Sequence, residues 1–497
     1  MKHADIIQTL DLEQKCALLS GGTVFDTRAL PGKGIPSITL SDGPNGVRKQ
    51  AGAADHLGLN PSVPATCFPT SATVANSWDP ALGEAVGEAM GEEAAAQEVS
   101  VLLGPGLNIK RSPLCGRNFE YFSEDPYLAG KMAAGYVRGI QKNGIAACPK
   151  HFAVNSQELR RMASDSIVDE RTLRELYLTG FEIVVKEAKP KTIMSSYNLV
   201  NGTYANENAH LLQDILRRDW GFDGAVVTDW GGSNDHALGV KNGSTLEMPF
   251  PGDDSVRELM KAVESGKISE HDVDARLDEL LELVLDTKAA VEKAPRTFDA
   301  AAHHALARRA AAQSIVLLRN EGALLPLKKG EKIAVLGDFA KTPRYQGAGS
   351  SAVNSIQVDS FLDCLTESGL ANVGYAQGFD RQGKADEALK KEAVALAQNA
   401  NVVLLCMGLD EIKESEGLDR MDMKLAQNQL DLLAAVAAVN PNVVVLLSAG
   451  SSLETPWLKD CKALVYGCLG GQAGAGALVD VLTGAVCPGG KLAETWA

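Results

Sequence analysis

Short apolar runs alternate with longer amphipathic stretches over roughly the first 290 residues of the chain. The runs with the character of buried strands lie at 37–40, 99–103, 145–148, 192–195 and 224–227. The stretches whose apolar positions recur at helical spacing lie at 71–98, 127–142, 170–189 and 206–220. Strands that alternate with helices in this way pair in parallel, so the pattern predicts either a closed (β/α)8 barrel or an open sheet.

The positions of the polar side chains favour the barrel. Polar residues follow directly after the carboxyl ends of four of the runs, at Asp42, Lys150, His151, Ser196, Tyr197 and Asp229. In a barrel these ends converge on one mouth, whereas an open sheet would spread most of them along an edge. No G-x-G-x-x-G motif opens a helix after the first strand, which disfavours a dinucleotide-binding fold.

A second series of strands and helices follows a charged, proline-containing stretch at 291–296, which is typical of a linker. Its apolar runs lie at 332–336, 402–407, 443–447 and 463–466, and its helical patterns at 385–398, 427–439 and 474–482. We therefore predict a barrel domain over 1–290, a linker and the helix that follows it over 291–330, and a second α/β domain over 331–497.

Composition and charge exclude several classes of function. The net charge of −15 opposes nucleic-acid binding, because phosphates would be repelled. Residues 1–15 lack the apolar core of a signal peptide, and no apolar run is long enough to span a bilayer. The nine cysteines never form a C-x-x-C pair. We expect a cytoplasmic protein with no metal, cofactor, nucleic-acid or membrane partner, and a homo-oligomer stays an open alternative.

Two strand ends carry candidate chemistry. Asp229 ends the run 224–228 and is followed by Trp230, so it could be a nucleophile or general base beside an apolar wall for a sugar. It could equally cap the next helix. Lys150 and His151 could hold substrate hydroxyls or lower the pKa of a nearby aspartate, or could be one solvated lysine and one structural histidine. The residues alone leave these alternatives open.

Other polar segments are ambiguous when taken singly. Residues 411–420 form a dense acidic stretch after a buried run, and composition favours a solvated loop there. Residues 347–351, Gly-Ala-Gly-Ser-Ser, lack the Gly-Lys-Ser/Thr ending of a phosphate-binding loop, which disfavours nucleoside triphosphates. Arg117 and Arg161 add hydrogen-bond donors, but isolated arginines are usually solvent-facing or paired for structural reasons.

Six motifs nevertheless occur in a fixed order along the chain. They are Ser-Asp-Gly-Pro-Asn-Gly-Val-Arg at 41–48, Asn-Ile-Lys-Arg-Ser-Pro-Leu-Cys-Gly-Arg-Asn-Phe-Glu at 108–120, Ser-Glu-Asp-Pro at 123–126, Lys-His-Phe at 150–152, Thr-Asp-Trp-Gly at 228–231 and Glu-Ser-Glu-Gly-Leu-Asp-Arg at 414–420. In this order the chain resembles glycoside hydrolase family 3 over essentially its whole length. The resemblance implies a TIM-like (β/α)8 barrel followed by an α/β sandwich domain.

The resemblance also implies roles for individual residues. Asp229 is similar to the family's nucleophile, and Glu416, on a loop of the second domain, to its acid/base, with Glu414 as the reserve candidate. The implied substrate-binding residues are Asp42, Arg117, Lys150, His151, Arg161, Met194, Tyr197, Trp230 and Ser350. Retaining hydrolysis needs an ionised nucleophile about 5–5.5 Å from a protonated carboxyl. We expect neighbouring positive charge to keep Asp229 ionised, and the nucleophile and apolar surroundings to raise the pKa of Glu416.

The implied activity is a retaining, exo-acting β-glycosidase. The loop at 153–158, Ala-Val-Asn-Ser-Gln-Glu, lacks the histidine of the family's β-N-acetylglucosaminidase branch, which favours unmodified sugars. We predict a β-glucosidase that releases terminal non-reducing β-D-glucose from a small β-glycoside or oligosaccharide. The alternatives are a β-xylosidase or α-L-arabinosidase of the same family and an inactive carbohydrate-binding protein; the intact carboxylate pair argues against the inactive protein.

The last ten residues, 488–497, resemble a family segment that normally leads on to more sandwich and often to a fibronectin-like domain, which we expect to be absent. We expect a shortened architecture or a fragment. Trp496 carries a large apolar surface, so we also expect the tail to pack on the protein rather than fray.

Overall fold

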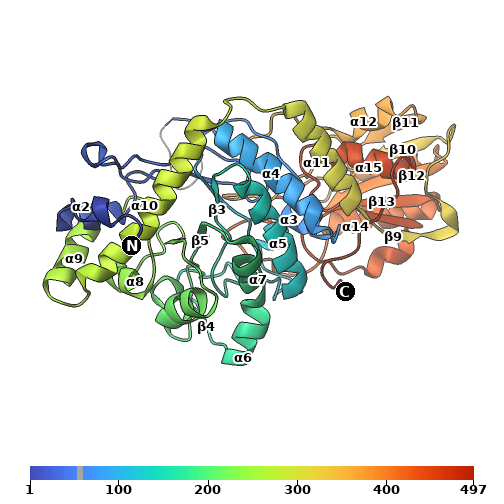
Figure 1. Cartoon of the computed structure of the whole chain (residues 1–497). Coiled ribbons are helices and arrows are strands. Elements are labelled where there is room, and N and C mark those ends of the chain that lie inside the picture. Colours follow the sequence, from blue (N-terminus) through green and yellow to red (C-terminus); the bar gives the residue numbers. More distant parts are fainter. Residues whose placement is uncertain (53–59) are drawn as a thin grey trace. The chain divides into compact units, whose positions relative to one another are not determined.

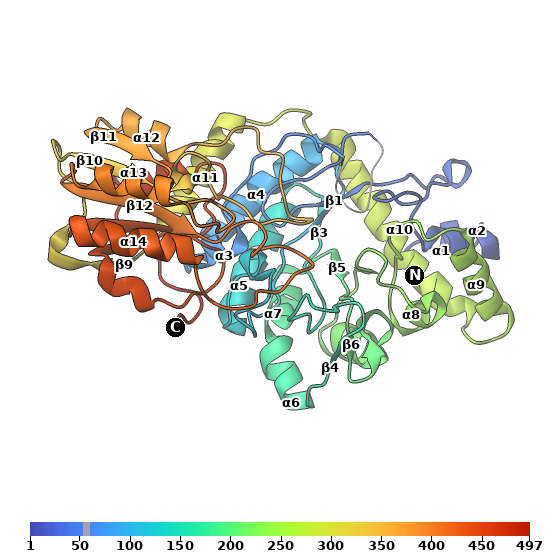
Figure 2. The same cartoon turned by 180° about the vertical axis from the view of Figure 1, so that it is seen from behind.

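The structure is a computed structural model that describes residues 1–52 and 60–497, and these residues form two compact units. Unit 1 comprises Met1–Ala65, Pro80–Ile109 and Asp125–Asp299. Unit 2 comprises Thr66–Asp79, Lys110–Glu124 and Ala300–Ala497. Two short segments from within the predicted 1–290 domain, 66–79 and 110–124, thus cluster with unit 2. Figures 1 and 2 show the elements of each unit from opposite sides.

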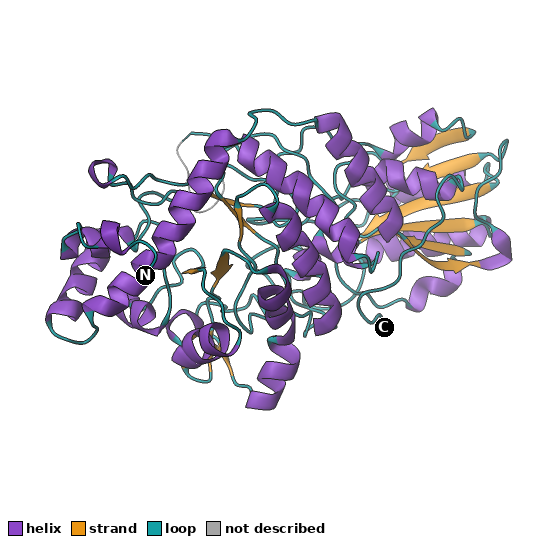
Figure 3. Cartoon of the chain, viewed as in Figure 1, coloured by secondary structure: helices purple, strands orange, loops and turns teal. Residues whose placement is uncertain are grey.

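Unit 1 contains short strands that are mostly parallel, shown in orange in Figure 3. They are β1 (Leu40–Asp42), β2 (Val101–Leu103), β3 (Ala146–Ala147), β4 (Asp165–Ser166), β5 (Thr192–Met194), β6 (Leu199–Val200), β7 (Thr203–Tyr204) and β8 (Ala225–Val227). Strands β1, β2 and β3 form one parallel sheet, and β5 pairs in parallel with β8. Strands β4, β6 and β7 form a separate small sheet.

Isolated parallel bridges connect the small sheets of unit 1. They join Gly106 to Lys150, Phe152 to Ser195, Val227 to Leu246, and Ser20 to Glu247. The backbone neighbours therefore run in the order 40–42, 101–106, 146–152, 192–195, 225–228, 245–247 and 19–21. The series also connects back to its first strand, because Leu40 N of β1 donates to Phe25 O at 2.8 Å, a few residues after the segment 19–21. The predicted polar strand ends thus belong to one continuous parallel series.

Helices surround these strands within unit 1. They are α1 (Ala4–Ile7), α2 (Leu12–Leu18), α4 (Pro80–Ala96), α5 (Pro126–Gln141), α6 (Glu170–Thr172), α7 (Thr179–Ala188), α8 (His236–Asn242), α9 (Asp253–Glu264) and α10 (Glu270–Lys293), with shorter helical segments η1 (Pro31–Lys33), η3 (Leu173–Tyr177), η4 (Ala205–Glu207) and η5 (His210–Asp219). Local sequence sets their starts. Asp125 caps α5 by accepting from Tyr127 N and Leu128 N, and Ser269 forms a capping box with Asp272 at the start of α10.

Glycines allow α4 and α5 to pack backbone against backbone. A Cβ atom at Gly87 would lie 2.5 Å from Tyr136 O, and one at Gly139 would lie 2.1 Å from Glu84 O. Both distances are too short for a side chain, so larger residues would force the two helices apart. The core of unit 1 consists of buried residues from its strands and helices, such as Val101, Ala146 and Val227.

Unit 2 contains a six-stranded sheet in the order β11-β10-β12-β13-β14-β9. Its strands are β9 (Val316–Asn320), β10 (Ile333–Leu336), β11 (Asn372–Ala376), β12 (Val402–Gly408), β13 (Val443–Ser448) and β14 (Ala463–Tyr466). All pairs are parallel except β14 with the edge strand β9. Strand β12 is buried at every residue, as expected for a parallel strand covered on both faces.

Helices cover both faces of this sheet. They are α3 (Ser71–Ala75), α11 (Ala300–Ser314), α12 (Phe361–Glu367), α13 (Glu387–Ala397), α14 (Gln427–Val439) and α15 (Gly474–Leu482), with shorter helical segments η2 (Asn118–Glu120), η6 (Glu321–Ala323), η7 (Asp338–Ala340) and η8 (Pro456–Asp460). Helices α11 and α12 contact α15 on the face nearer the viewer in Figure 1. Helices α13 and α14 contact each other on the opposite face, seen in Figure 2. The predicted α/β class is therefore confirmed.

Some predicted elements differ from the structure, and two strands of unit 2 were not predicted. The predicted helix at 71–98 is two helices, α3 and α4, which break ahead of Pro80 and fall into different units. The predicted linker begins inside α10, which runs to Lys293 and ends just before the Ala294-Pro295 step that disfavours helix. The edge strands β9 and β11 were not predicted; most of their residues are partly or fully exposed, and β11 has no apolar run, whereas β9 includes part of one at 315–318.

The C-terminal tail packs on unit 2, as the sequence predicts. Lys110 Nζ pairs with Glu494 Oε1 at 2.9 Å, and both side chains are buried. The Trp496 ring lies edge-on to the Tyr466 ring with centroids 4.7 Å apart. Burial raises the pKa of the Glu494 carboxyl, while the Lys110 charge opposes that rise. None of the helices in the described part of the chain is both long and apolar enough to cross a membrane.

Removing residues 492–497 should destabilise unit 2. The truncation leaves the Lys110 ammonium buried without its carboxylate and uncovers Tyr466. Loss of one partner of a buried ion pair costs about 3–5 kcal/mol, so the midpoint of thermal unfolding should fall by several degrees. Circular dichroism melts measure this. Lys491→Gln is the control, because Lys491 Nζ donates only to the nearby carbonyls of Gly489 and Gly490. An unchanged midpoint in the truncated chain would contradict a stabilising role for the tail.

Candidate functional site

Asp229 lies two residues beyond the end of β8, and its carboxylate is held at a fixed position. Its Oδ1 accepts from Trp230 N at 2.8 Å, and its Oδ2 lies 3.7 Å from His151 Nε2. The preceding residue is fixed by Met248, whose N donates to Thr228 Oγ1 at 2.8 Å and whose O accepts from the same hydroxyl at 3.1 Å. The side chain of Asp229 is only 11% exposed, so charge on it is poorly screened by water.

His151 and Lys150 follow β3, as predicted, and are almost fully buried. Asn108 clamps the backbone of His151: Asn108 Oδ1 accepts from His151 N at 2.7 Å, and Asn108 Nδ2 donates to His151 O at 2.9 Å. Lys150 N donates to Pro105 O at 3.0 Å, so the backbone of the lysine is fixed as well. An ammonium group beside a carboxylate at a strand end can donate hydrogen bonds to the hydroxyls of a ligand.

Lys150 and Asp229 act electrostatically on the same neighbour. Burial raises the pKa of the Cys148 thiol to about 12, the Lys150 charge lowers it and the Asp229 charge raises it. Lys150 precedes His151, whose Nε2 lies 3.7 Å from Asp229 Oδ2, so both charged residues lie around the carboxyl end of β3. A lysine cation in this position favours the ionised form of Asp229.

An aromatic wall lies beside Asp229. Tyr197 Oη donates to Trp230 O at 2.9 Å, and the Trp230 indole N–H donates to Val24 O at 2.7 Å. The Trp230 ring also packs against Phe25 with centroids 5.3 Å apart. Both rings are thus fixed by a polar atom as well as by packing, which presents a rigid apolar surface.

Arg161 lies on the outer side of this wall. Its guanidinium carbon is 4.8 Å from the centre of the Tyr197 ring, and its Nη1 donates to Glu158 Oε2 at 2.8 Å. The Glu158 side chain is almost fully buried, so it anchors a more exposed arginine. Stacking and the ion pair together fix the direction of the Arg161 fork.

The last two predicted residues of unit 1 also lie at strand ends. Met194 ends β5 and is buried, and Asp42 ends β1, where its carbonyl accepts from Arg48 N at 2.9 Å. All the predicted unit 1 positions except Arg161, which lies in a turn, therefore follow the strands of the parallel series. His151 contacts Asp229, and Tyr197 contacts both Arg161 and Trp230. Sequence reasoning assigned no role to Asn108, Arg48 or Glu158. The first two lie inside the quoted motifs, which was the available signal.

In unit 2 the Glu416 carboxylate is held by Ser350 and Arg117. Glu416 Oε2 accepts from Ser350 N at 2.8 Å and from Ser350 Oγ at 2.5 Å. Glu416 Oε1 lies 3.6 Å from Arg117 Nη1. Ser350 was predicted to bind substrate; the structure shows its hydroxyl and amide on Glu416, and a contact with sugar stays a prediction. Arg117 is buried and also pairs with the buried carboxylate of Glu120.

Two glycines allow the Glu416 loop to pack this closely. Gly349 has a φ of +118°, and a Cβ there would lie 2.4 Å from Glu416 Cβ. A Cβ at Gly116 would lie 1.6 Å from Leu418 O, and Gly116 N donates to Asp419 Oδ1 at 3.1 Å. The segment 347–351 thus brings its backbone at Gly349 against the loop that carries Glu416.

Glu414, the reserve candidate, has a different environment from Glu416. Its Oε1 accepts from Gly450 N at 2.6 Å and from Ser451 Oγ at 2.9 Å, and its Oε2 lies 3.4 Å from Arg344 Nη2. Its side chain is 1% exposed, against 17% for Glu416. Within the described residues, no group of three or more His, Cys, Asp or Glu side chains is arranged to hold a metal ion.

Comparison with known proteins identifies the family. Residues 53–283 match the model of the "Glycosyl hydrolase family 3 N terminal domain", and residues 315–497 match the "Glycosyl hydrolase family 3 C-terminal domain". The chain belongs to glycosyl hydrolase family 3. The family resemblance stated from the six sequence motifs is therefore confirmed.

Individual family members are also similar over nearly the whole chain. "Thermostable beta-glucosidase B" of Acetivibrio thermocellus is 48% identical over 99% of this chain and 65% of that protein. "Exo-alpha-(1->6)-L-arabinopyranosidase" of Bifidobacterium longum is 46% identical over 98% of this chain and 66% of that protein. The solved structure of beta-glucosidase 3B from Thermotoga neapolitana in complex with α-D-glucose is 33% identical, with a TM-score of 0.90 over 100% of this chain and 76% of that chain. The chain thus spans just under two thirds of the length of the first two relatives.

Replacing Asn108 tests the clamp on His151. Asn108→Ala leaves a buried backbone N–H and C=O unpaired, and each unpaired group costs about 1–3 kcal/mol. We expect the free energy of unfolding in urea to fall by a similar amount for each group. Asn201→Gly is the matched control, because Asn201 makes the same two bonds to Val168 at an exposed site where water can replace them, and its φ of +51° suits glycine. If the free energy of unfolding fell equally in the two variants, burial of the Asn108 hydrogen bonds would not be what makes them stabilising.

Proposed function

We propose that this chain carries retaining β-glycosidase activity and acts on small β-glucosides, releasing terminal non-reducing β-D-glucose. The observation that carries the proposal is Asp229 at its strand end, held by Trp230 N–H and facing His151, with the buried Lys150 preceding that histidine in the chain. This arrangement supplies an oriented carboxylate, a cation and an apolar wall, which are the groups that a sugar ring and its hydroxyls require. The similarity to two β-glucosidases supports the choice of glucose.

The proposal includes a barrel and a sandwich. The continuous parallel series of unit 1, with its closing bond between Leu40 and Phe25, supports a TIM-like (β/α)8 barrel. The six-stranded sheet of unit 2, with helices on both faces, supports an α/β sandwich. On this arrangement the candidate sugar-binding residues of unit 1 lie at the carboxyl ends of the strands, where chemistry is found in such barrels.

Asp229 is the proposed nucleophile. An attacking carboxylate must be ionised and must keep one oxygen directed at the anomeric carbon, because a misplaced oxygen forfeits much of the rate. The hydrogen bond from Trp230 N orients the group, and the nearby cation of Lys150 favours its charge. Attack forms a covalent glycosyl-enzyme ester and expels the aglycone, and water then hydrolyses the ester, so the anomeric configuration is retained.

Glu416 is the proposed acid/base. It must donate a proton to the leaving oxygen in the first step and accept one from water in the second. Ser350 suits both states, because its hydroxyl can donate to the carboxylate or accept from the protonated carboxyl, while its N–H remains a donor. Glu414 supports this choice by contrast: its carboxylate is enclosed by Gly450, Ser451 and Arg344 and is less accessible to a leaving group.

A second candidate function is the hydrolysis of α-L-arabinopyranosides. The observation that favours it is the 46% identity to an exo-α-(1→6)-L-arabinopyranosidase, nearly as high as the identity to the β-glucosidase.

A panel of p-nitrophenyl glycosides on the purified chain tests the proposal. We expect the β-D-glucoside to be turned over with the highest kcat/KM, and proton NMR to show the β-anomer of glucose released first. Preference for the α-L-arabinopyranoside or β-D-xyloside would select the second candidate or the xylosidase alternative. Binding without turnover would select the inactive carbohydrate-binding protein. Initial release of α-glucose from the β-glucoside would contradict the retaining mechanism.

Leaving-group dependence tests Glu416. General acid catalysis contributes about 10²–10⁴-fold, so Glu416→Ala should slow hydrolysis of an unactivated β-glucoside by a factor in that range. A dinitrophenyl glucoside, which needs little protonation, should retain most of its rate in the first step. Azide should restore part of the turnover by replacing water. Ser350→Ala should show the same dependence more weakly.

Glu414→Gln is the control for this series. It removes a charge from the buried neighbour of Arg344 and should lower stability without changing the dependence on the leaving group. If Glu414→Gln shows that dependence and azide rescue, and Glu416→Ala does not, Glu414 is the acid/base.

A further inference from the structure

A cavity lies at the carboxyl end of the unit 2 sheet and is separate from the contacts around Glu416. Its lining residues come from the segments after β10 and β14, from the ends of β12 and β13, and from the start of α15; those that matter here are Arg344, Tyr345, Asp359, Ser448, Gly474 and Ala475. It offers about 40 Å³ to water-sized molecules. One water needs about 10–15 Å³ on this measure, so a group of a few heavy atoms fits.

The position of the cavity matches a general rule for open parallel sheets. From β10 the chain goes to β11 on one side, and from β11 it returns to β12 on the other side of β10. Ligands of such sheets bind outside the carboxyl ends of the strands, where connections diverge in this way. The cavity takes lining residues from the ends of both β12 and β13 and from the segment after β10.

Helix α15 presents its first turn to this cavity. The loop from β14 to α15 is rich in glycine, at positions 467, 470, 471 and 474. No side chain caps the helix at Ala473, and Gly474 and Ala475 both line the cavity. A Cβ at Gly474 would meet nothing within 4 Å, so open space lies where a side chain would begin. Uncapped N–H groups at a helix N-terminus favour an anion.

Arg344 is the second, independent observation. Its side chain is 1% exposed, and its Nε and Nη1 have no hydrogen-bond partner. Its Nη2 makes long contacts of 3.4 Å to Asp410 O and to Glu414 Oε2, and its Nε lies 4.0 Å from Glu411 Oε1. A buried guanidinium normally satisfies its fork with a carboxylate or phosphate. The acidic group in the lining, Asp359, is already paired with His304 at 3.3 Å.

We propose that this cavity binds a small oxyanion, a phosphate or carboxylate group, between the Arg344 guanidinium and the first turn of α15. Two kinds of donor line it: a guanidinium whose Nε and Nη1 make no hydrogen bond, and the first turn of α15, which has no side-chain cap although Gly474 N donates to Gly471 O at 3.1 Å. The site uses neither Asp229 nor Glu416, so it goes beyond the proposed hydrolysis and stands or falls separately from it.

Calorimetric titration of the purified chain with inorganic phosphate, at constant ionic strength set by sodium chloride, tests the site. We expect saturable binding of one phosphate per chain. Gly474→Ala should weaken it at least tenfold, because the added methyl group occupies the open space. This variant should fold normally, since alanine suits a helix start. Arg344→Lys should also weaken binding at least tenfold, because lysine keeps the charge but loses the fork.

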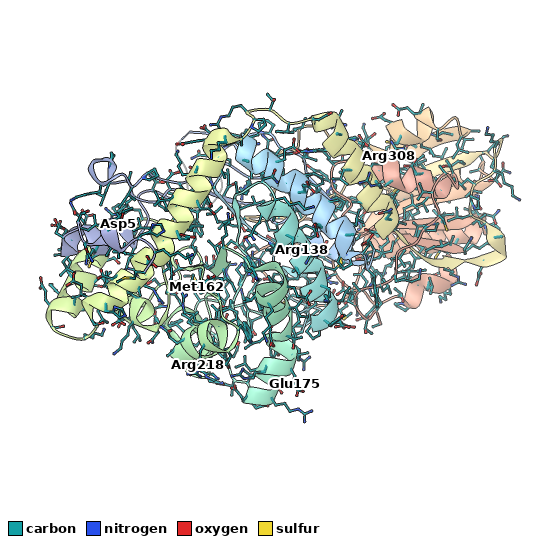
Figure 4. All side chains as sticks on the ribbon, in the orientation of Figure 1. Asp5, Arg138, Met162, Glu175, Arg218 and Arg308 are labelled. Carbon is teal, nitrogen blue, oxygen red and sulfur yellow. The ribbon has the colours of Figure 1, made fainter. Side chains whose placement is uncertain are left out.

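Two matched variants separate the cavity from general effects of surface charge. Gly489→Ala adds a methyl group at another glycine with open space, and Arg308→Lys changes an arginine on α11, labelled in Figure 4, that pairs with Asp480. Both should bind phosphate like the unmodified chain. A parallel titration with acetate shows whether a carboxylate or a phosphate is preferred, and saturable binding of either supports the site. Absence of binding for both anions, or equal binding by Gly474→Ala and the unmodified chain, would overturn the proposal.

Discussion

Hydrogen bonds from backbone N–H groups hold both candidate catalytic carboxylates, and the local structure of each unit serves to present those donors. Asp229 receives its bond from the residue that follows it, at the end of a buried strand. Glu416 receives its bond from Ser350, on a separate loop. A backbone donor cannot rotate away as a side chain can, so the carboxylates are oriented before a ligand arrives. Such preorganisation avoids the cost of ordering charged groups during a reaction.

The two donors place different demands on the sequence. For Asp229 the demand is met locally, because a parallel strand buried on both sides delivers its next residues to a fixed point. For Glu416 two separate loops must approach closely, and the approach is limited by side-chain volume. Gly349 and Gly116 meet that demand by leaving room for Glu416 Cβ and Leu418 O. The chemistry of unit 2 thus depends on residues that have no side chain at all.

The sequence predicts this structure best where a pattern repeats along one element. Helices α14 and α15 begin and end where their patterns predict, and the strand ends that carry Lys150 and Asp229 follow runs that are buried throughout. The edge strand β11 escaped prediction because exposed residues interrupt its apolar pattern, whereas β9 was missed although an apolar run lies at 315–318. The contact of Ser350 with Glu416 could not be predicted, since it depends on a bridge between Ala348 and Ser415 that no local signal encodes. The family motifs pointed to Glu416 where composition alone favoured a solvated loop.

The division into units follows contacts rather than chain order. The chain passes from one unit to the other at five places, after residues 65, 79, 109, 124 and 299. Lys110 and Arg117 reach unit 2 on one of the short excursions, and Thr73 reaches it on the other, where its hydroxyl donates to Leu469 O. A cut at residue 299 would therefore yield neither unit whole. The two units are therefore not interchangeable modules. A recombinant that exchanged only residues 300–497 would combine Glu416 of one parent with Arg117 of the other, so the two residues must remain compatible across parents.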